Sequence, residues 1–201
     1  MLEVTMKSFN VEELDERQIY KLMSGSIIPR PIAWVTTQNR SGLVNVAPFS
    51  FFNVVSSQPP LVSIAFTAKK DTFNNIMATK EAVIHLISSQ NVKEMNLTAS
   101  KLNSNESEAD KYDLELIPSQ RVTVPSLKNS LVRFETVLYK HIPLENDAQF
   151  VILKLKNFIF DEEVLEESSL HILAEKLDPV ARLAGNNFAT LGEQWTLIRP
   201  E

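Results

Sequence analysis

Hydrophobic and polar residues alternate with a period of two along much of the chain. The segments 32–37, 43–49, 61–67 and 82–88 are rich in β-branched and aromatic residues, and proline, glycine or polar clusters separate them. Two later segments, 131–139 and 149–160, repeat the alternation over longer stretches, as half-buried antiparallel strands do. The pattern predicts six or more strands at short spacing, which favours a closed or partly closed antiparallel barrel.

Helical spacing interrupts the strand pattern in a few short segments. Asn10 and Glu13 form a capping-box pattern before an apolar face, which predicts one leading helix. Asp71 precedes apolar residues at three- and four-residue spacing, so we expect it to cap a short helix between two strands. Residues 91–100 are a further helix candidate. Residues 99–113 are polar and acidic, which predicts an exposed, mobile excursion.

Composition limits the chemistry that the chain could perform. The 201 residues are 44% hydrophobic, enough for the core of one domain, and the net charge of −5 argues against a nucleic-acid binder. The absence of cysteine excludes thiol nucleophiles, disulfides and cysteine-ligated metals. The four glycines form no glycine-rich nucleotide loop. Any redox chemistry therefore needs a cofactor, and any phosphate needs another kind of binding site.

Targeting signals are not apparent in the sequence. The first 25 residues carry many charges and no apolar core, so we expect a cytoplasmic protein without a signal peptide. The longest charge-free stretch, residues 41–68, is interrupted by three prolines and predicts no membrane-spanning helix. His85, His141 and His171 are too dispersed for a zinc motif, and we expect structural or surface histidines and no metal site.

The charge-free stretch contains the most informative segment. Residues 45–53 mix small polar side chains with three phenylalanines, so their polar atoms need buried partners. One partner could be a flat heteroaromatic ligand with hydrogen-bonding edges, and the alternative is a strand that turns a barrel corner. Residues 69–72, of sequence Lys-Lys-Asp-Thr, offer ammonium charge, a hydroxyl and a helix N-terminus that could hold a phosphate.

Four motifs occur in an order that resembles the flavin reductase-like, FMN-binding split-barrel family. They are PRPIAWVTT at 29–37, GLVNVAPFSFFN at 42–53, the proline pair at 59–60, and KDTFNNI at 70–76. Residues 182–188, RLAGNNF, are similar to a C-terminal arginine and aromatic element of the family, although this element is usually richer in glycine and ends in tyrosine.

The resemblance implies a mainly β fold, namely a six-stranded antiparallel Greek-key split barrel with short peripheral helices. It implies a single domain over residues 1–201, with the barrel core at about 25–165 and with the N-terminal helix and C-terminal extension packed on it. It also implies a homodimer that binds FMN non-covalently near the subunit interface, with NAD(P)H as the electron donor.

Particular residues follow from the same resemblance. Thr36, Thr37 and residues 47–53 would line the flavin, and Lys70 and Thr72 would bind its phosphate. Arg30 is either an auxiliary charge or a surface arginine between two prolines. The C-terminal element would approach the flavin or the nicotinamide, either of its own chain or of the partner subunit. The expected cofactor-binding set is Arg30, Thr36, Thr37, Asn45, Ala47, Pro48, Phe49, Ser50, Phe51, Asn53, Lys70, Thr72, Arg182, Asn187 and Phe188, with no obligatory catalytic side chain.

The implied function is an NAD(P)H-dependent flavin reductase that supplies reduced flavin to a monooxygenase or another acceptor, as nitrilotriacetate-type members of the family do. Hydride transfer to a flavin is chemistry of the cofactor, which agrees with the lack of an evident catalytic constellation. Two alternatives stay open at this point. One is a flavoredoxin-like electron carrier, and the other is a non-enzymatic FMN-binding dimer.

Overall fold

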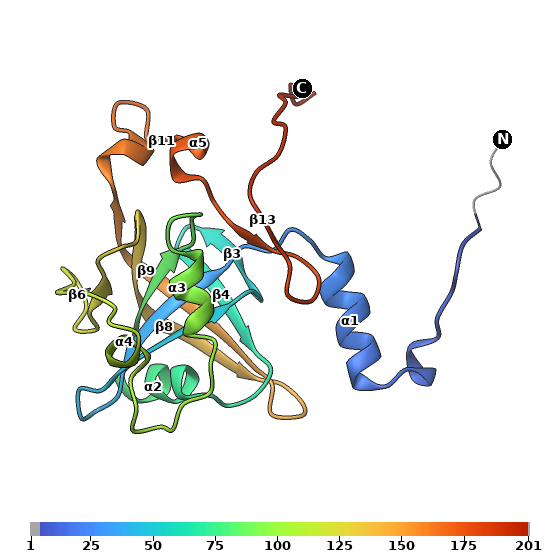
Figure 1. Ribbon diagram of the computed structural model, residues 1–201, viewed down its shortest axis with the longest axis horizontal. Helices are drawn as coiled ribbons and strands as arrows, with labels where there is room; N and C mark the ends of the chain where they lie inside the picture. Colours follow the sequence, from blue (N-terminus) through green and yellow to red (C-terminus); the bar gives the residue numbers. More distant parts are fainter. Residues whose placement is uncertain (1–4, 201) are drawn as a thin grey trace.

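One seven-stranded antiparallel sheet dominates the computed structural model, which describes residues 5–200 (Figure 1). The strand order is β2-β1-β5-β8-β9-β4-β3. The mainly β split-barrel fold is confirmed, with one strand more than the six expected. The strands are β1 (Ala33–Gln38), β2 (Val44–Phe49), β3 (Phe52–Ser57), β4 (Pro60–Phe66), β5 (Glu81–Leu86), β8 (Val132–Pro143) and β9 (Gln149–Phe160).

The additional strand is β3, which lies at one edge of the sheet. Its side chains are mostly exposed, and Val54 and Val55 both face solvent, so its sequence lacks the alternation that reveals a half-buried strand. The alternation in the sequence therefore predicts no strand for this segment.

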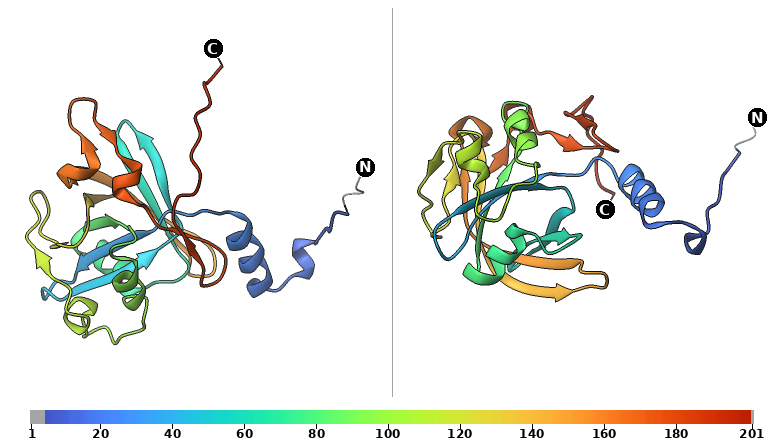
Figure 2. Two further views of the ribbon diagram at one scale, coloured as in Figure 1. Left: turned by 45° about the horizontal axis from the view of Figure 1, so that its top comes forward. Right: turned by 60° about the horizontal axis from the view of Figure 1, so that its bottom comes forward.

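The sheet curls until its two edges approach each other. Strands β2 and β3 are the opposite edges in the strand order, yet only Ser50 and Phe51 connect them. The Ala65 N–H donates to the carbonyl of Phe51 at 2.8 Å, which fixes this connection against β4. A connection of two residues can join opposite edges only in a barrel-like sheet, and Figure 2 shows the resulting curvature.

Two hydrophobic clusters pack on the two faces of the curled sheet. Val35 and Ile64 belong to the cluster inside the curl, which helix α2 (Asp71–Thr79) closes with Phe73 and Ile76. The adjacent Trp34 points to the other face and packs there with Val46, Leu127 and neighbouring residues. The alternation along β1 therefore places successive side chains in different cores.

The leading helix begins later than the sequence predicts. Asp15 caps α1 (Glu16–Ser26) through a reciprocal box, in which the Gln18 N–H donates to Asp15 at 2.7 Å and the Asp15 N–H donates to Gln18 at 2.9 Å. Asn10 caps only the 3₁₀ turn η1 (Val11–Glu13), with a longer bond of 3.3 Å to the Glu12 N–H. The prediction of one continuous helix from Asn10 was wrong because a second, better capping box follows it.

Two further local predictions need correction. The N-cap of α2 is Lys70, and Asp71 is the first helical residue. The segment 99–113 contains α4 (Glu108–Lys111), where Glu108 and Ala109 are buried, so it is not wholly an exposed excursion. The burial has a polar cause, because the Glu108 carboxylate accepts the Val46 N–H at 2.9 Å and holds the segment against β2. The helix expected at 91–100 is present as α3 (Val92–Leu97).

Small elements complete the chain on either side of the sheet. They are β6 (Leu116–Ile117), β7 (Ser126–Leu127), η2 (Glu162–Val164), β10 (Leu165–Glu166), β11 (His171–Ile172), α5 (Ala174–Leu177), β12 (Ala181–Arg182) and β13 (Phe188–Ala189). Helix α1 lies beside the barrel, and the C-terminal segment after β13 extends away from it (Figure 1). Within residues 5–200, no helix is long and apolar enough to cross a membrane.

Candidate functional site

Two cavities meet at the seam where β2 runs toward β3. The aromatic chamber, of about 480 Å³, is lined by Glu16, Arg17 and Tyr20 of α1, by residues 48–51 and 65–67, and by Lys70. The polar chamber, of about 380 Å³, is lined by Asn45, residues 47–49, 69–72 and 98–102, and Glu108. Pro48, Phe49 and Lys70 border both chambers, so the two form one bipartite site.

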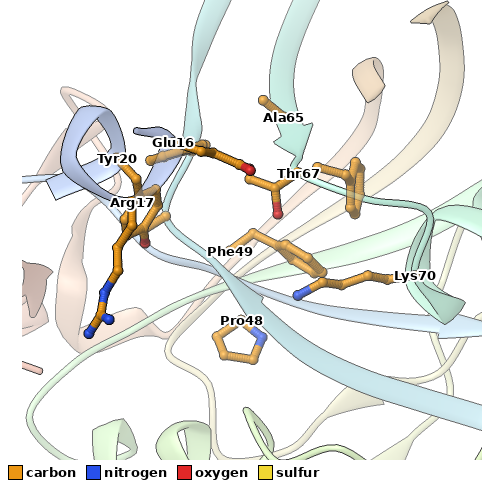
Figure 3. A pocket seen from close by; sticks show the side chains of 11 residues that line it. Glu16, Arg17, Tyr20, Pro48, Phe49, Ala65, Thr67 and Lys70 are labelled. Atoms are coloured by element: carbon orange, nitrogen blue, oxygen red, sulfur yellow. The ribbon is translucent and has the colours of Figure 1, made fainter. Parts of the chain in front are cut away.

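The aromatic chamber offers flat apolar surfaces at several angles. The rings of Phe49 and Phe66 meet edge to face with centroids 4.8 Å apart. On the α1 side, the rings of Tyr20 and Phe51 lie 6.2 Å apart at a tilt of 45°. In Figure 3 the Lys70 side chain extends beside Phe49, while Tyr20 and Arg17 stand on the opposite side. A planar heteroaromatic ring would find large contact surfaces and few competing charges there.

The polar chamber contains the expected phosphate-binding residues. Asn45 on β2 donates through Nδ2 to the Thr72 hydroxyl at 2.8 Å, and Thr72 is only 1% exposed. No side chain caps the N-terminus of α2, since its N-cap residue is Lys70. The backbone N–H groups of the first turn therefore remain available for an anion. Among residues 5–200, Lys70 forms no ion pair, whereas Lys69 pairs with Asp147 at 3.5 Å.

The carboxylate of Glu108 is the unexpected member of this chamber. It is only 6% exposed and accepts the Val46 N–H on β2. Burial raises the pKa of the Glu108 carboxyl, the bond from Val46 counteracts this, and the charge of Asp71 raises it further. Glu108 both fixes the covering segment to β2 and places a carboxyl group next to the predicted anion site.

Arg30 joins three segments of the chain through its guanidinium. The side chain is 7% exposed, and its guanidinium donates to the carbonyls of Ser24, Ile27 at 2.9 Å and Leu183 at 3.1 Å. Nε also donates to the Ser50 hydroxyl at 3.4 Å. These bonds join the end of α1, the β2–β3 connection and the C-terminal segment. Four of its five N–H donors have partners within the chain, so we leave Arg30 out of the proposed site, and its role as an auxiliary charge at the flavin stays a prediction.

Thr36 and Thr37 also lie away from both chambers. Both are fully buried, and the Thr36 hydroxyl donates to the carbonyl of Pro125 at 2.7 Å. The Thr37 hydroxyl accepts the Asn75 side-chain amide at 3.1 Å, which joins β1 to α2. Neither residue lines a chamber, whereas Thr72 does, so we leave both out of the proposed site.

The remaining expected residues divide between the chambers and their surroundings. Ala47, Pro48 and Phe49 line the polar chamber, and Ser50 and Phe51 line the aromatic one. Asn53 lines neither, because it lies beyond the connection on β3, where its side-chain oxygen accepts the Val54 N–H.

The C-terminal element lies outside both chambers of the same chain. The Arg182 guanidinium lies 4.6 Å from the centroid of the Phe188 ring, and its Nη2 donates to the carbonyl of Gly185. Phe188 packs against the core cluster around Trp34, and neither it nor Asn187 lines a chamber. A role at the flavin for this element would require a second subunit.

Sequence reasoning missed the α1 wall and Glu108. One side of α1 carries Glu16, Arg17 and Tyr20, which line the aromatic chamber. The sequence pattern of this helix indicates only its apolar residues and gives no sign of this side. Glu108 is separated from β2 by about sixty residues, and no local pattern distinguishes it from the acidic residues around it. Only the folded arrangement brings these residues to the site.

His85 is the most strongly perturbed titratable group and belongs to the core. It is fully buried, with Nδ1 2.9 Å from the carbonyl of Trp34, while Nε2 accepts the Leu127 N–H at 2.9 Å. Burial lowers the pKa of His85 to about 3. The neutral ring therefore fastens β5 to its neighbours. In the described part of the chain, no group of three or more acidic or histidine side chains could hold a metal.

The chain is similar to known proteins along nearly its whole length. The family model of the flavin reductase like domain matches residues 23–187. The uncharacterized protein YwrF of Bacillus subtilis is 43% identical over 97% of this chain and 100% of its own length. Nitrilotriacetate monooxygenase component B from Bacillus cereus superposes with a TM-score of 0.93 at 40% identity, covering 97% of this chain and 100% of that one. The Pseudomonas fluorescens 2-nitrobenzoate 2-nitroreductase NbaA gives 0.89 at 32% identity, covering 96% of each chain.

Proposed function

The chain belongs to the flavin reductase-like domain family, and on that premise we propose that it is an NAD(P)H:FMN oxidoreductase that binds FMN non-covalently. The bipartite site carries the proposal. A flavin mononucleotide has a planar ring system at one end and a phosphate at the other, and the aromatic and polar chambers offer matching surfaces on either side of Phe49.

The residues of the polar chamber fit a phosphate without a glycine-rich loop. Lys70 supplies a positive charge, Thr72 a hydroxyl held in place by Asn45, and the uncapped start of α2 supplies backbone N–H groups. Charge-assisted bonds from an ammonium to a phosphate are among the stronger hydrogen bonds in proteins. In this proposal these residues bind the FMN phosphate.

The aromatic chamber takes the flavin ring. A bound flavin supplies the centre that accepts a hydride from the nicotinamide, so the protein needs no obligatory acid or base of its own. Phe49 and Phe51 contribute apolar surface against the ring, and Ser50 and the neighbouring backbone contribute hydrogen-bonding groups at its edge. The contribution of the protein is to orient the two reactants and to limit access of water.

The similarity to nitrilotriacetate monooxygenase component B supports a role as the reductase partner of a monooxygenase, to which the protein would pass reduced flavin. The nitroreductase NbaA is nearly as similar in structure, which makes a nitroaromatic compound a second candidate acceptor. We propose the monooxygenase role first because the component B chain has the higher identity and superposes more closely.

We also propose that two copies of the chain form a homodimer. Tyr20, Leu22 and Met23 on α1 are about half exposed, and Trp195 in the C-terminal segment is 75% exposed. Apolar surface of this extent at both ends of one chain is typical of an intersubunit contact. Burial against a second copy would also account for the C-terminal element that lies away from the site of its own chain.

Anaerobic reduction tests the proposed activity. The purified protein loaded with FMN is mixed with NADH or NADPH, and the visible flavin band is followed. A reductase bleaches with at least one nucleotide and oxidises it repeatedly when free FMN is added. An electron carrier would give little turnover with free FMN. A yellow protein that neither nucleotide bleaches would be a non-enzymatic flavin-binding dimer, and the proposed activity would be wrong.

A double variant tests the phosphate assignment. Lys70→Ala with Thr72→Ala should raise the Kd for FMN by more than tenfold, because each charge-assisted bond contributes about 1.5–3 kcal/mol. Quenching of flavin fluorescence on binding measures this Kd. Lys156→Ala removes an exposed lysine of β9 that lines neither chamber and is the matched control. Equal affinities in the two variants would refute the assignment.

A further inference from the structure

Helix α1 forms a separate wall of the aromatic chamber through one of its faces. Glu16, Arg17 and Tyr20 occupy the first and second turns and line the chamber opposite the barrel. Figure 3 shows the Arg17 side chain on the α1 side, where its guanidinium extends outward from Phe49, and Lys70 on the barrel side. The site therefore has a cationic side chain on each side of its aromatic centre.

The fold holds this helix with an unusual contact. Only Ser24 of α1 is buried, so hydrophobic burial contributes little to its attachment. Instead the Arg30 guanidinium binds the carbonyls of Ser24 and Ile27 at the C-terminal end of the helix. These bonds hold the C-terminal end of the helix, and its first turn, which carries Arg17, lines the chamber. A helix fixed in this way is suited to positioning a side chain, because its contribution to the core is small.

The charge of Arg17 is available to a ligand. Among residues 5–200, no carboxylate lies within 4.0 Å of its guanidinium. The N-terminus of α1 is not itself an anion site, because the Asp15 side chain already accepts the Gln18 N–H there. The guanidinium is planar and always charged, and it can bind phosphate oxygens through two parallel bonds. The chemistry of this wall therefore suits a phosphate ester.

We propose that Arg17 binds the pyrophosphate of the dinucleotide electron donor. This inference rests on the proposed reductase function, which requires two phosphorylated ligands at one site. The flavin phosphate has its own ligands in the polar chamber, at Lys70 and Thr72. Arg17 lines the aromatic chamber and not the polar chamber, so we assign it to the second phosphorylated ligand. Arg17 is thus a determinant of donor affinity and not of flavin affinity.

Binding of oxidised nucleotides to the FMN-loaded protein tests this assignment without turnover. NAD⁺ and NADP⁺ are titrated by calorimetry into the wild type, Arg17→Ala and Arg17→Lys. We expect the nucleotide Kd to rise about tenfold or more in Arg17→Ala and less in Arg17→Lys, which keeps the charge but loses the paired bonds. The Kd for FMN should stay within twofold of wild type, and KM for the donor should rise while kcat is nearly unchanged.

Lys21→Ala is the matched control, because Lys21 is an exposed cation one turn further along α1 that does not line the chamber. If Arg17→Ala behaves like Lys21→Ala, the inference is wrong. It is equally wrong if Arg17→Ala weakens FMN and leaves nucleotide binding intact, because Arg17 would then serve the flavin phosphate. A wild-type protein that binds neither nucleotide and is not bleached by their reduced forms overturns the proposed function as well, which separates the two failures.

Discussion

Replacing Arg30 should detach two peripheral elements while leaving the barrel folded. In the variant Arg30→Met the apolar part of the side chain keeps most of its volume, but the guanidinium is lost. The carbonyls of Ser24, Ile27 and Leu183 then have no donor from this residue. Since α1 has a single buried residue, few other contacts hold it in place.

The size of the effect follows from these bonds. A hydrogen bond to a charged group contributes about 1.5–3 kcal/mol net, and removing one partner of a buried charged cluster typically costs about 3–5 kcal/mol. Water can solvate the freed carbonyls once α1 moves away, so we expect the total to stay within the range of about 3–5 kcal/mol. Arg30→Lys should recover only part of it, because one ammonium cannot reach carbonyls on both sides of the clamp.

Hydrogen exchange measured by mass spectrometry locates the loss. Peptides from α1 and from the β12–β13 hairpin should exchange about a hundredfold faster in Arg30→Met, the factor that about 3 kcal/mol represents. Peptides from β1 and β5 should keep their protection. Arg40→Ala, in the exposed turn after β1, controls for the loss of an arginine charge. Unchanged exchange in α1, or a large loss of FMN affinity with α1 still protected, would refute the role of Arg30 as a clamp.

Three other results are expected. The pKa of His85 is about 3 in the folded protein and about 6.5 in the unfolded chain, so between these pH values only the unfolded chain binds the proton. The free energy of unfolding should therefore fall by up to about 1.4 kcal/mol per pH unit as the pH decreases through that range. In denaturant titrations, His85→Gln should flatten this pH dependence. Glu108→Gln can still accept the Val46 N–H but removes a negative charge from the polar chamber. The Kd for FMN at pH 8 should therefore fall about threefold or more. An unchanged Kd would contradict the proposed phosphate position. Substitution of Trp195, Leu197 and Ile198 by serine should lower the dimer fraction measured by light scattering, whereas Val54→Ser, which also alters an exposed apolar residue, should not.

The strands could be predicted where one of their faces is buried. In β9 the side chains alternate between buried and partly buried along most of the strand, and the sequence carries the same alternation. In β3 the side chains of Val54 and Val55 both face solvent, so sequence periodicity carries no signal. The phosphate-binding role of Lys70 and Thr72 stays a prediction, and it could be made because the two residues are close in sequence and their chemistry is recognisable without the fold.

Long-range polar contacts could not be predicted. Arg30 and Lys70 are both cations within the motifs at 29–37 and 70–76, and the sequence alone does not show which of them would bind a phosphate. The fold separates them, because the carbonyl of Leu183, more than 150 positions away in sequence, meets the Arg30 guanidinium. The partner of the Val46 N–H is likewise 62 residues away, at Glu108. Such pairs depend on the closure of the sheet, and no pattern within either segment encodes them.

The closure of the sheet also explains why the site lies where it does. β2 is an edge strand, and an edge strand leaves backbone groups without a strand partner. Two positions of this edge need no strand partner, since the Val46 N–H donates to Glu108 and Pro48 has no N–H. A ligand can therefore lie against residues 45–51 without competing for strand pairing. The same seam brings α1 and α2 to its two sides, so Arg17 and Lys70 line one aromatic chamber from different elements.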